Sequence, residues 1–325
     1  MNSGILVLVE HLKGAVADVS FEVLGAGRKL ADALQARLYA AVLARDAAPL
    51  TAGLGLADAV LAAEDSALEA PSPEVVAAVL SQLLAQQQAA LVLLPGSNMG
   101  IGAGPTLSAA TGLPFVNFCK EVKALDGQVV ITTQLFGGKI LAEVLLAGAG
   151  GILSLVAGAL PAEAGRSDRA PVVRKVSVTI PPPQVVFKRL LEPAAGDVDI
   201  TKQDVLVSVG RGIQNQDNIA LAEQVAALLN GAVSASRPVV DQGWLPLTRQ
   251  VGKSGMTVAP KLYLALGISG APEHWEGMKN AQMIIAVNTD PQAPIFGFAH
   301  YGAALDVLDL IEPLKAAIEA RKSAP

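Results

Sequence analysis

Polar, glycine-rich turns follow the apolar runs in the second half of the chain, and they hold most of the residues that could bind a ligand. These turns span residues 209–215, 234–246, 249–260, 267–278 and 287–299. Their glycines let a main chain approach a ligand closely, and the helix starts that follow present amides suited to phosphate. The side chains that add positive charge or hydrogen-bond donors are Arg211, Arg237, Lys253 and His274. Because such turns meet at the carboxyl ends of parallel strands, the pattern predicts a site for a large anionic nucleotide cofactor.

Several better-known motifs are incomplete. Gly252-Lys253-Ser254 resembles the end of a phosphate-binding P-loop, but Leu247 stands where that motif requires glycine. The dinucleotide fingerprint fails after Gly210-Arg211-Gly212, because Asn215 occupies the place of its third glycine. The three histidines have no carboxylate or cysteine at metal-ligand spacing. The sequence therefore argues against a hydrolase, a P-loop NTPase and a zinc enzyme, and it predicts neither a metal site nor a catalytic residue.

The composition indicates a folded protein with an aliphatic core. The chain has 325 residues, which predicts about two domains, and 52% of them are hydrophobic while only 16% are charged. Aromatic residues make up 4%, so alanine, valine, leucine and isoleucine must fill the core, as in helices packed on buried parallel strands. The net charge of −5 and the lack of a basic tail argue against nucleic acid as a partner.

The single cysteine, the N-terminal residues and two uncharged stretches indicate the cellular compartment and the redox chemistry to expect. The single cysteine, Cys119, is expected to be a buried apolar residue. Residues 1–9 show no signal-peptide pattern, so we expect a cytoplasmic protein. The uncharged stretches 75–119 and 144–162 are interrupted by glutamine, glycine and proline. Buried strands with glycine-rich turns explain both stretches better than membrane insertion does.

The elements expected in the first half alternate between strands and helices. Short apolar runs predict strands at 4–9, 38–44, 89–94 and 151–157, and helical spacing predicts helices at 20–37 and 73–87. Ser72 and Pro73 are typical of a helix start. In 121–133, Asp126-Gly127 between two β-prone runs predicts a hairpin.

A domain boundary is expected within 176–192, where Pro181-Pro182-Pro183 can continue neither a helix nor a central strand. We place it near Glu192–Pro193, giving domains 1–192 and 193–325. The second domain repeats the alternation, with strands at 204–210, 232–236, 261–269 and 283–289 and helices at 219–230, 272–280 and 303–321, the last broken at Pro313. The predicted fold class is α/β, with two doubly wound domains and mostly parallel sheets.

The run SRPVVDQGWLPLTRQVGKSGMTVAPKLYLALGISGAPEHWEGMKNAQMIIAVNTDPQAPIFGFAHYG, together with SVGRG near residue 208, resembles the FAD-binding domain of the electron-transfer flavoprotein alpha subunit. The first half is similar in layout but looser in sequence. The resemblance implies FAD in a Rossmann-like C-terminal domain and an N-terminal domain facing a beta subunit. It implies electron transfer from flavin-dependent dehydrogenases, such as acyl-CoA dehydrogenases of fatty acid beta-oxidation, to an acceptor such as a membrane quinone oxidoreductase.

The resemblance also implies the FAD-binding residues, carried over position by position. They are Arg211, Ser236, Arg237, Val251, Gly252, Lys253, Ser254, Ser269, Gly270, Ala271, Pro272, Glu273, His274, Asn288, Asp306 and Val307. In the family, the arginine matched by Arg237 lies beside the isoalloxazine ring, where a guanidinium stabilises an anionic semiquinone because it stays protonated. Ser254 is placed near flavin N5, and His274 near the O2 carbonyl.

The other positions are assigned to the phosphate and adenosine parts of the cofactor. Ser269 matches a pyrophosphate contact, and Asn288 and Asp306, the latter within the tail helix, match the adenosine end. Lys253 and Glu273 depart from the family, which commonly has glutamine at both positions. Alternatives to these roles are a surface salt bridge for Arg237, a structural histidine at 274 and a solvated helix carboxylate at 306.

Two further interpretations remain open. Residues 95–105, PGSNMGIGAGP, invite a phosphate-loop interpretation, but the resemblance places AMP in the beta subunit, so this loop is expected to be structural or subunit-facing. The alternative function is the alpha subunit of a flavin-bifurcating, NADH-oxidising complex with a second flavin in the beta subunit. A scaffold that has lost FAD is disfavoured because nearly every polar contact position is present.

Overall fold

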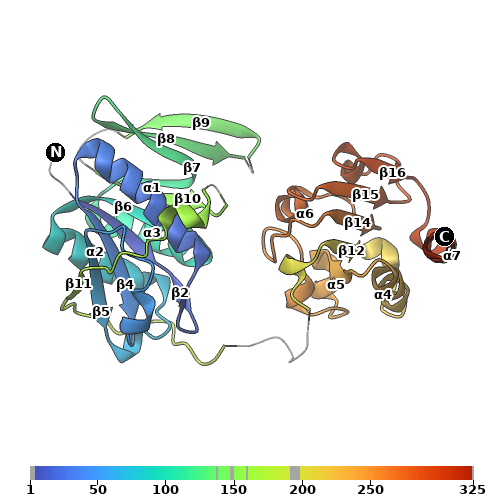
Figure 1. Cartoon of the computed structure of the whole chain (residues 1–325), viewed down its shortest axis with the longest axis horizontal. Helices are drawn as coiled ribbons and strands as arrows, with labels where there is room; N and C mark the ends of the chain where they lie inside the picture. The colour runs from blue at the N-terminus through green and yellow to red at the C-terminus, as the bar shows by residue number, and fades with distance from the viewer. Residues whose placement is uncertain (1–3, 137, 147–149, 159, 191–197, 324–325) are drawn as a thin grey trace. The chain divides into compact units, whose positions relative to one another are not determined.

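The computed structural model describes residues 4–136, 138–146, 150–158, 160–190 and 198–323. The chain divides into two compact units, Met1–Arg189 and Leu190–Pro325, here called the N-terminal and C-terminal units (Figure 1). The predicted boundary at Glu192–Pro193 lies outside the described residues. None of the helices in the described part of the chain is long and apolar enough to cross a membrane.

The N-terminal unit is built on one large sheet. Its strands follow the order β11-β5-β4-β1-β6-β10-β7-β8-β9, and all neighbouring pairs are parallel except those that β8 makes with β7 and β9. The strands are β1 (Gly4–Val9), β4 (Leu38–Ala44), β5 (Ala59–Glu64), β6 (Ala89–Gly96), β7 (Phe115–Leu125), β8 (Gln128–Leu135), β9 (Ile140–Leu145), β10 (Gly151–Val156) and β11 (Val173–Lys175). A separate short ribbon pairs β2 (His11–Leu12) with β3 (Ala15–Val16). The four predicted strands are confirmed, whereas β2, β3, β5, β9 and β11 were not predicted.

The predicted hairpin is confirmed in β7 and β8. Leu125 pairs with Gln128, and the two residues between them, Asp126 and Gly127, have φ angles of 50° and 76°. Positive φ at both central positions matches the twist of the flanking strands, and aspartate and glycine tolerate it best. Beyond β8 the chain turns again into β9, which ends the sheet.

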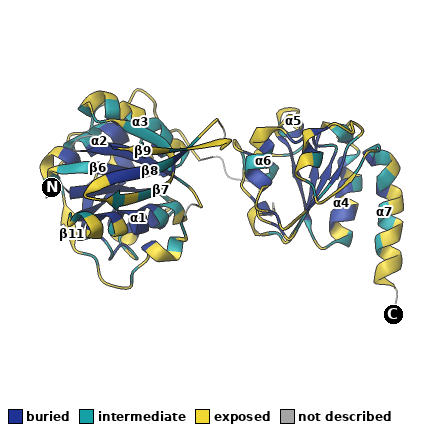
Figure 2. Ribbon diagram, turned by 90° about the horizontal axis from the view of Figure 1, so that it is seen from above, coloured by how far each residue is buried: buried dark blue, intermediate teal, exposed yellow. Residues whose placement is uncertain are grey.

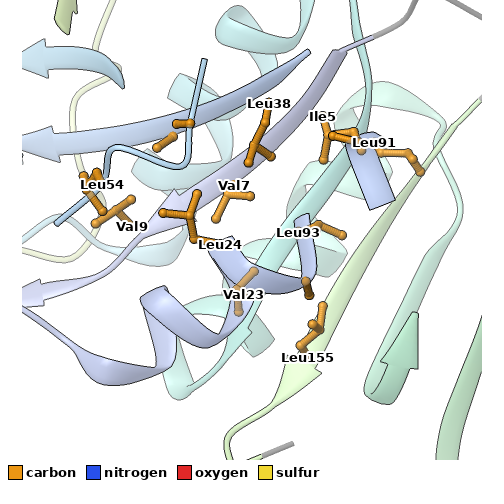
Figure 3. Packing of buried hydrophobic residues seen from close by; sticks show 14 of the residues in the cluster. Ile5, Val7, Val9, Val23, Leu24, Leu38, Leu54, Leu91, Leu93 and Leu155 are labelled. Atoms are coloured by element: carbon orange, nitrogen blue, oxygen red, sulfur yellow. The ribbon is translucent and has the colours of Figure 1, made fainter. Parts of the chain in front are cut away.

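Helices cover both faces of this sheet because its buried strands carry apolar side chains on both sides. Ile5, Val7 and Val9 of β1 pack with α1 (Asp18–Leu34), where Val23 and Leu24 are fully buried (Figure 3). The alternate β1 residues face α2 (Pro73–Gln87) and α3 (Asn98–Thr111) on the other side. The bounds of α2 are as predicted, although Ser72 at its N-cap makes no side-chain cap bond.

Residues 95–105 are not a loop, which corrects the prediction. After β6 the chain enters α3 at Asn98 and continues through Pro105. The glycines of this segment allow close packing: a Cβ on Gly100 would lie 1.9 Å from the Pro95 carbonyl oxygen, and one on Gly104 would lie 2.4 Å from the Phe115 ring. Tertiary packing therefore overrides the low helix propensity of the glycines.

The C-terminal unit contains a fully parallel sheet in the order β13-β12-β14-β15-β16. Its strands are β12 (Val205–Val209), β13 (Ala232–Ala235), β14 (Leu262–Leu266), β15 (Met283–Val287) and β16 (Tyr301–Ala303). Its helices are α4 (Ile219–Leu228), α5 (Arg237–Asp241), α6 (Pro272–Met278) and α7 (Val307–Lys322). With the parallel sheets of both units, the predicted α/β class is confirmed. The short helix α5 falls within a segment predicted to be a turn.

The two faces of the second sheet have separate cores. Val207 and Val209 of β12 pack with residues of α4, α5 and α7, whereas Leu206 packs with Tyr263 and with Met278 of α6. In Figure 2 the inner strands of this sheet are mostly dark blue and the outer sides of the helices are yellow, as expected for apolar faces buried between layers. Short 3₁₀ turns complete both units: η1 (Ala48–Leu50), η2 (Ser66–Leu68), η3 (Ala162–Gly165), η4 (Ile200–Lys202), η5 (Arg211–Ile213), η6 (Leu247–Arg249) and η7 (Pro294–Gly297).

The tail helix differs from its prediction at two places. It begins at Val307, after the unpredicted strand β16, and it continues through Pro313 instead of breaking there. An interior proline removes one hydrogen bond and strains the preceding turn. Apolar residues on both sides of Pro313, including Ile311 and Leu314, pack on the same core, and this packing keeps the helix continuous.

Candidate functional site

The predicted site residues lie on segments that leave the carboxyl ends of the five parallel strands in the C-terminal unit. Arg211 follows β12, Ser236 follows β13, Ser269 follows β14 and Asn288 follows β15. Because neighbouring strands run in the same direction, these positions share one edge of the sheet, here called the carboxyl edge. The structure thus brings together residues that are separated by up to 77 positions in the sequence (211 to 288).

The first two segments present arginines to solvent. Arg211 starts η5, and its side chain is exposed. Ser236 is buried at the N-cap of α5, where its amide donates to the Val209 carbonyl across 3.0 Å. Arg237 begins the helix, and its exposed Nε lies 3.3 Å from Oδ2 of Asp241. An exposed pair of this kind contributes little to stability, so the guanidinium is free to reorient toward a ligand.

The loop from Val251 to Ser254 is pressed against α6. The Lys253 amide donates to the Glu273 carbonyl across 2.7 Å, and the Val251 amide donates to the Ala235 carbonyl across 2.9 Å. Gly252 has a φ of 139°, and a Cβ there would lie 2.9 Å from the Glu273 carbonyl oxygen. The Ser254 hydroxyl accepts a 2.9 Å hydrogen bond from Nε2 of the buried Gln250, which leaves its own proton available to a ligand.

The turn after β14 corrects the interpretation of its glycines. Gly267 and Gly270 have φ angles of 66° and 85°, and Cβ atoms there would meet the backbone of Gly212 at 2.5 Å and of Ile295 at 2.3 Å. These glycines let protein loops approach each other, not only a ligand. Ser269, Ala271, Pro272 and Glu273 are exposed, while Gly270 is buried.

The start of α6 has fewer available amides than expected. The His274 and Trp275 amides both donate to the Ala271 carbonyl, across 2.9 and 3.0 Å, and Pro272 has no N–H. Within Pro272–Trp275, the Glu273 amide therefore makes no main-chain hydrogen bond with the described residues, and it can donate to an anion.

His274 is buried beneath these loops. Its Nε2 lies 2.9 Å from the Tyr263 hydroxyl, while its buried Nδ1 has no hydrogen-bond partner among the described residues. Burial lowers the pKa of His274 to about 4, and the main chain at Val251 opposes only part of this effect. The imidazole is therefore neutral at physiological pH, and it supplies a hydrogen-bonding atom, not the positive charge that the sequence pattern suggested.

The three remaining predicted residues already have structural roles. The Asn288 amide group donates to the Ile268 carbonyl and accepts from the Asp290 amide, both across 2.9 Å. Asp306 is the N-cap of α7, not a residue within the helix: it accepts from the Leu308 amide across 2.9 Å and from Nε2 of Gln214 across 3.0 Å. The Val307 side chain is buried in the core. These residues tie the turns of the carboxyl edge together.

Sequence reasoning missed the polar residues that support the edge from below. Ser208, Ser234, Gln250 and Tyr263 are all buried. A signal for two of them was present, because serines inside the apolar strands VLVSV and AVSA must be buried and are therefore expected to have a specific partner.

The corresponding edge of the N-terminal unit is organised differently. Glu10 follows β1 and Ser97 follows the neighbouring parallel strand β6. The Ser97 hydroxyl donates to Oε1 of Glu10 and accepts from the Gly100 amide across 3.1 Å. Burial raises the pKa of Glu10, and hydrogen bonds from Ser97 and Gly100 oppose the shift. A side-chain carboxylate therefore lies at the start of α3, where an anionic ligand would otherwise be favoured.

Other candidate chemistries find no support in the described residues. Cys119 is buried as predicted, and burial raises the pKa of its thiol to about 12, so it is an inert side chain. No group of three or more potential metal-ligating side chains occurs within the described part of the chain.

Comparisons with known proteins cover both units. Residues 5–181 match the family model described as the electron transfer flavoprotein domain, and residues 199–279 match the electron transfer flavoprotein FAD-binding domain. The electron transfer flavoprotein subunit alpha of Methylophilus methylotrophus is 34% identical over 324 residues, covering 98% of this chain and 100% of the relative. That of Mycobacterium leprae (strain TN) is 36% identical, covering 98% of each chain. The acryloyl-CoA reductase electron transfer subunit beta of Anaerotignum propionicum is 32% identical, covering 98% of this chain and 96% of the relative.

Proposed function

This chain belongs to the electron transfer flavoprotein alpha-subunit family, and from that premise we propose that it is the FAD-carrying half of a heterodimeric electron carrier. FAD is its cofactor, because its second half contains the FAD-binding domain of the family, and the family implies a beta subunit as its partner. In this proposal the carrier takes electrons from flavin-dependent dehydrogenases, such as acyl-CoA dehydrogenases in cytoplasmic fatty acid beta-oxidation. It delivers them to a further acceptor such as a membrane quinone oxidoreductase.

The observation that best supports an FAD site at the carboxyl edge is the buried Nδ1 of His274, which has no hydrogen-bond partner among the described residues. A buried polar atom without a partner is costly, so a ligand atom that completes its hydrogen bonding gains affinity. Arg211, Arg237 and Lys253 extend exposed cationic side chains from neighbouring turns of the same edge, as binding of a pyrophosphate requires. The sixteen residues named from the sequence are proposed to form this site, although Asn288, Asp306 and Val307 lie outside the matched range 199–279.

The residues of this chain would hold the cofactor and set its surroundings. Bound FAD supplies the redox chemistry, since a flavin accepts two electrons and releases them singly. Arg237 keeps its charge at any physiological pH, so it favours added negative charge nearby. His274 remains neutral and buried, and it therefore orients the cofactor without delivering a proton. We assign no catalytic residue, because a carrier needs no substrate chemistry of its own.

The antiparallel strands of the N-terminal unit are the proposed surface for the beta subunit. Ile140, Leu141 and Leu145 of the edge strand β9 are each more than half exposed, and Phe136 before it is 74% exposed. Exposed apolar residues on an unpaired edge strand favour association with another chain. Leu141→Lys should weaken the heterodimer at least tenfold, whereas Leu12→Lys, at another exposed leucine of this unit, should not. Equal dissociation constants for the two variants, measured by analytical ultracentrifugation, would show that β9 is not part of the interface.

The proposed function is tested by co-expression with a beta subunit of the family from the same organism. The purified heterodimer should contain FAD and should be reduced by an acyl-CoA dehydrogenase in the presence of its acyl-CoA substrate. Reoxidation should require an added acceptor. A FAD-loaded chain that remains monomeric and accepts electrons without a beta subunit would contradict the proposal.

The similarity to an acryloyl-CoA reductase electron transfer subunit favours one second candidate. In that case the complex oxidises NADH, carries a second flavin in the beta subunit and supplies a reductase. The same preparation distinguishes the two functions. One FAD per heterodimer without reduction by NADH supports the carrier, whereas two flavins with rapid reduction by NADH support the second candidate.

A further inference from the structure

A chain of three buried polar side chains supports His274 from the core of the C-terminal unit. The Tyr263 hydroxyl lies 2.7 Å from Oγ of Ser208 and 2.9 Å from Nε2 of His274. Tyr263 and Ser208 are fully buried, and His274 is 7% exposed. We call these three residues the Ser–Tyr–His chain.

The sheet register explains why these residues meet. Tyr263 of β14 pairs with Leu206 of β12, and Ser208 lies two residues further along β12, on the same face as Leu206. The Tyr263 ring therefore reaches diagonally toward the carboxyl edge. His274, in the first turn of α6, meets its hydroxyl from that edge, with the two rings edge to face at 6.1 Å.

The hydrogen count of the chain determines whether Nδ1 of His274 offers a ligand a lone pair or an N–H. The Tyr263 oxygen has one proton and can also accept, so it can bond both neighbours at once. When Tyr263 donates to Ser208, it accepts from Nε2–H, and Nδ1 presents a lone pair. When Ser208 donates to Tyr263 instead, Tyr263 donates to Nε2, and Nδ1 carries the proton. Both arrangements are neutral and use the same heavy-atom positions.

We propose that Tyr263 and Ser208 are positioning residues that commit Nε2 of His274 to the core and present its Nδ1 to bound FAD. The chain supplies a lone pair or an N–H there, according to the cofactor atom opposite. The proposal rests on the proposed function only in taking FAD as the ligand. The burial that keeps His274 neutral agrees with it, since an imidazolium could not accept at Nδ1.

A stability role alone does not account for the arrangement. Apart from the buried Ser234, which pairs with Ser208 across β12 and β13, the surrounding face is apolar and is formed by residues such as Leu206, Ala265 and Met278. Phenylalanine and alanine would fill the positions of Tyr263 and Ser208 without any buried hydroxyl to satisfy. The polar chain instead ends at Nδ1, a buried atom that makes no hydrogen bond with the described residues, on a ring whose pKa is influenced by the Val251 main chain of the carboxyl edge.

The first test measures the hydrogen bonding of His274 without any flavin. In ¹⁵N-histidine spectra of the apo heterodimer, assigned by loss of the signal in His274→Gln, the ring should be neutral and its Nε2 shift should show the hydrogen bond to Tyr263. In Tyr263→Phe the Nε2 shift should change, whereas Tyr39→Phe, at the buried tyrosine of the N-terminal unit, should leave the spectrum unchanged. An unaltered His274 spectrum in Tyr263→Phe would overturn the proposal.

The second test asks whether Tyr263 acts on FAD through His274. Tyr263→Phe should weaken FAD binding about fivefold to tenfold and shift the flavin reduction potential, and Tyr39→Phe should do neither. In a His274→Gln background the same change should shift the potential no further. Additive shifts would show that Tyr263 acts independently of His274 and would contradict the proposal. A heterodimer that takes up no FAD would contradict the proposed function, while the apo spectra would still decide the role of Tyr263.

Discussion

The two units of this chain place opposite chemistry at equivalent points of similar sheets. In each unit the first strand of the large sheet lies between two strands that come later in the chain. In the N-terminal unit β1 lies between β4 and β6, and in the C-terminal unit β12 lies between β13 and β14. At the carboxyl ends of β1 and β6 the N-terminal unit has Glu10 and Ser97. At the carboxyl ends of β12 and β14 the C-terminal unit has Arg211 and the turn toward His274.

This difference shows that the fold provides a position for a ligand in both units, and that a few side chains decide whether a ligand binds there. In open α/β sheets, ligands bind at the carboxyl ends of the strands where the strand order reverses, a place here called the switch point. The acidic side chain of Glu10 accepts from Ser97 at the start of α3, so the N-terminal unit satisfies its own switch point with an internal hydrogen bond. The C-terminal unit leaves Nδ1 of His274 unpaired and exposes cations there. One switch point is satisfied by the protein's own side chains, and we propose that FAD completes the other.

The largest expected effect comes from placing a methyl group where two turns of the C-terminal unit meet. Gly270→Ala and Gly243→Ala both place alanine at positive φ, 85° and 73°. A Cβ at 270 meets the Ile295 backbone at 2.3 Å, whereas one at 243 has open space. Gly243→Ala should cost about 1 kcal/mol of unfolding free energy and Gly270→Ala about 3 kcal/mol or more, with loss of FAD. Urea unfolding measures both, and similar losses would contradict this account of the turn.

The two switch points should respond to pH in opposite directions in the apo heterodimer. His274 has a lowered pKa, so the unfolded state binds more protons, and the stability of the C-terminal unit should fall as pH drops from 6.5 to about 4. The loss should approach about 3 kcal/mol. Glu10 has a raised pKa, so its contribution should instead decrease as pH rises above 4.5.

Hydrogen exchange of amides in β14 and β1 follows each unit separately. His274→Gln should remove the acid sensitivity of β14 only, and Glu10→Gln should remove the pH dependence that Glu10 gives to β1 only. The same pH response in both strands of the parent would argue against this assignment.

A smaller effect is expected from the exposed charge at the C-terminal site. Arg237→Ala should change the unfolding free energy by less than about 0.5 kcal/mol, because its ion pair with Asp241 is exposed. It should lower the first one-electron reduction potential of bound FAD by roughly 40–130 mV, equivalent to about 1–3 kcal/mol for one lost charge interaction. Lys261→Ala is the matched control, since this exposed lysine pairs with Asp204 at the opposite edge of the same sheet. If potentiometric titration finds the same reduction potential in both variants as in the parent, Arg237 does not lie beside the flavin.

The sequence could predict those parts of the fold that local chemistry decides. Pro73 marks the start of α2, and Asp126-Gly127 supplies the two positive φ angles of the hairpin. Pro313 misled the prediction because its effect depends on packing at both sides of the helix, which a local pattern does not contain. Glycines 100 and 104 misled it for the same reason, since only the fold brings Pro95 and Phe115 against them.

The candidate site could likewise be predicted from the sequence only in part. Strand-end turns made it possible to predict that Arg211, Ser236 and Ser269 share one edge. The neutral state of His274 could not be predicted, because it depends on burial that the fold creates. Likewise, the partner of its Nε2 is Tyr263, whose hydroxyl is placed by the pairing of β12 with β14.

The central claim, that FAD completes the C-terminal switch point and leaves the N-terminal one unchanged, is tested most directly by hydrogen–deuterium exchange. The apo heterodimer is compared before and after addition of FAD. We predict protection in 210–214, 236–241, 250–255 and 268–275, with no change at Glu10 or in 96–101. Protection at Glu10 and 96–101 without protection of the four C-terminal segments would contradict the account.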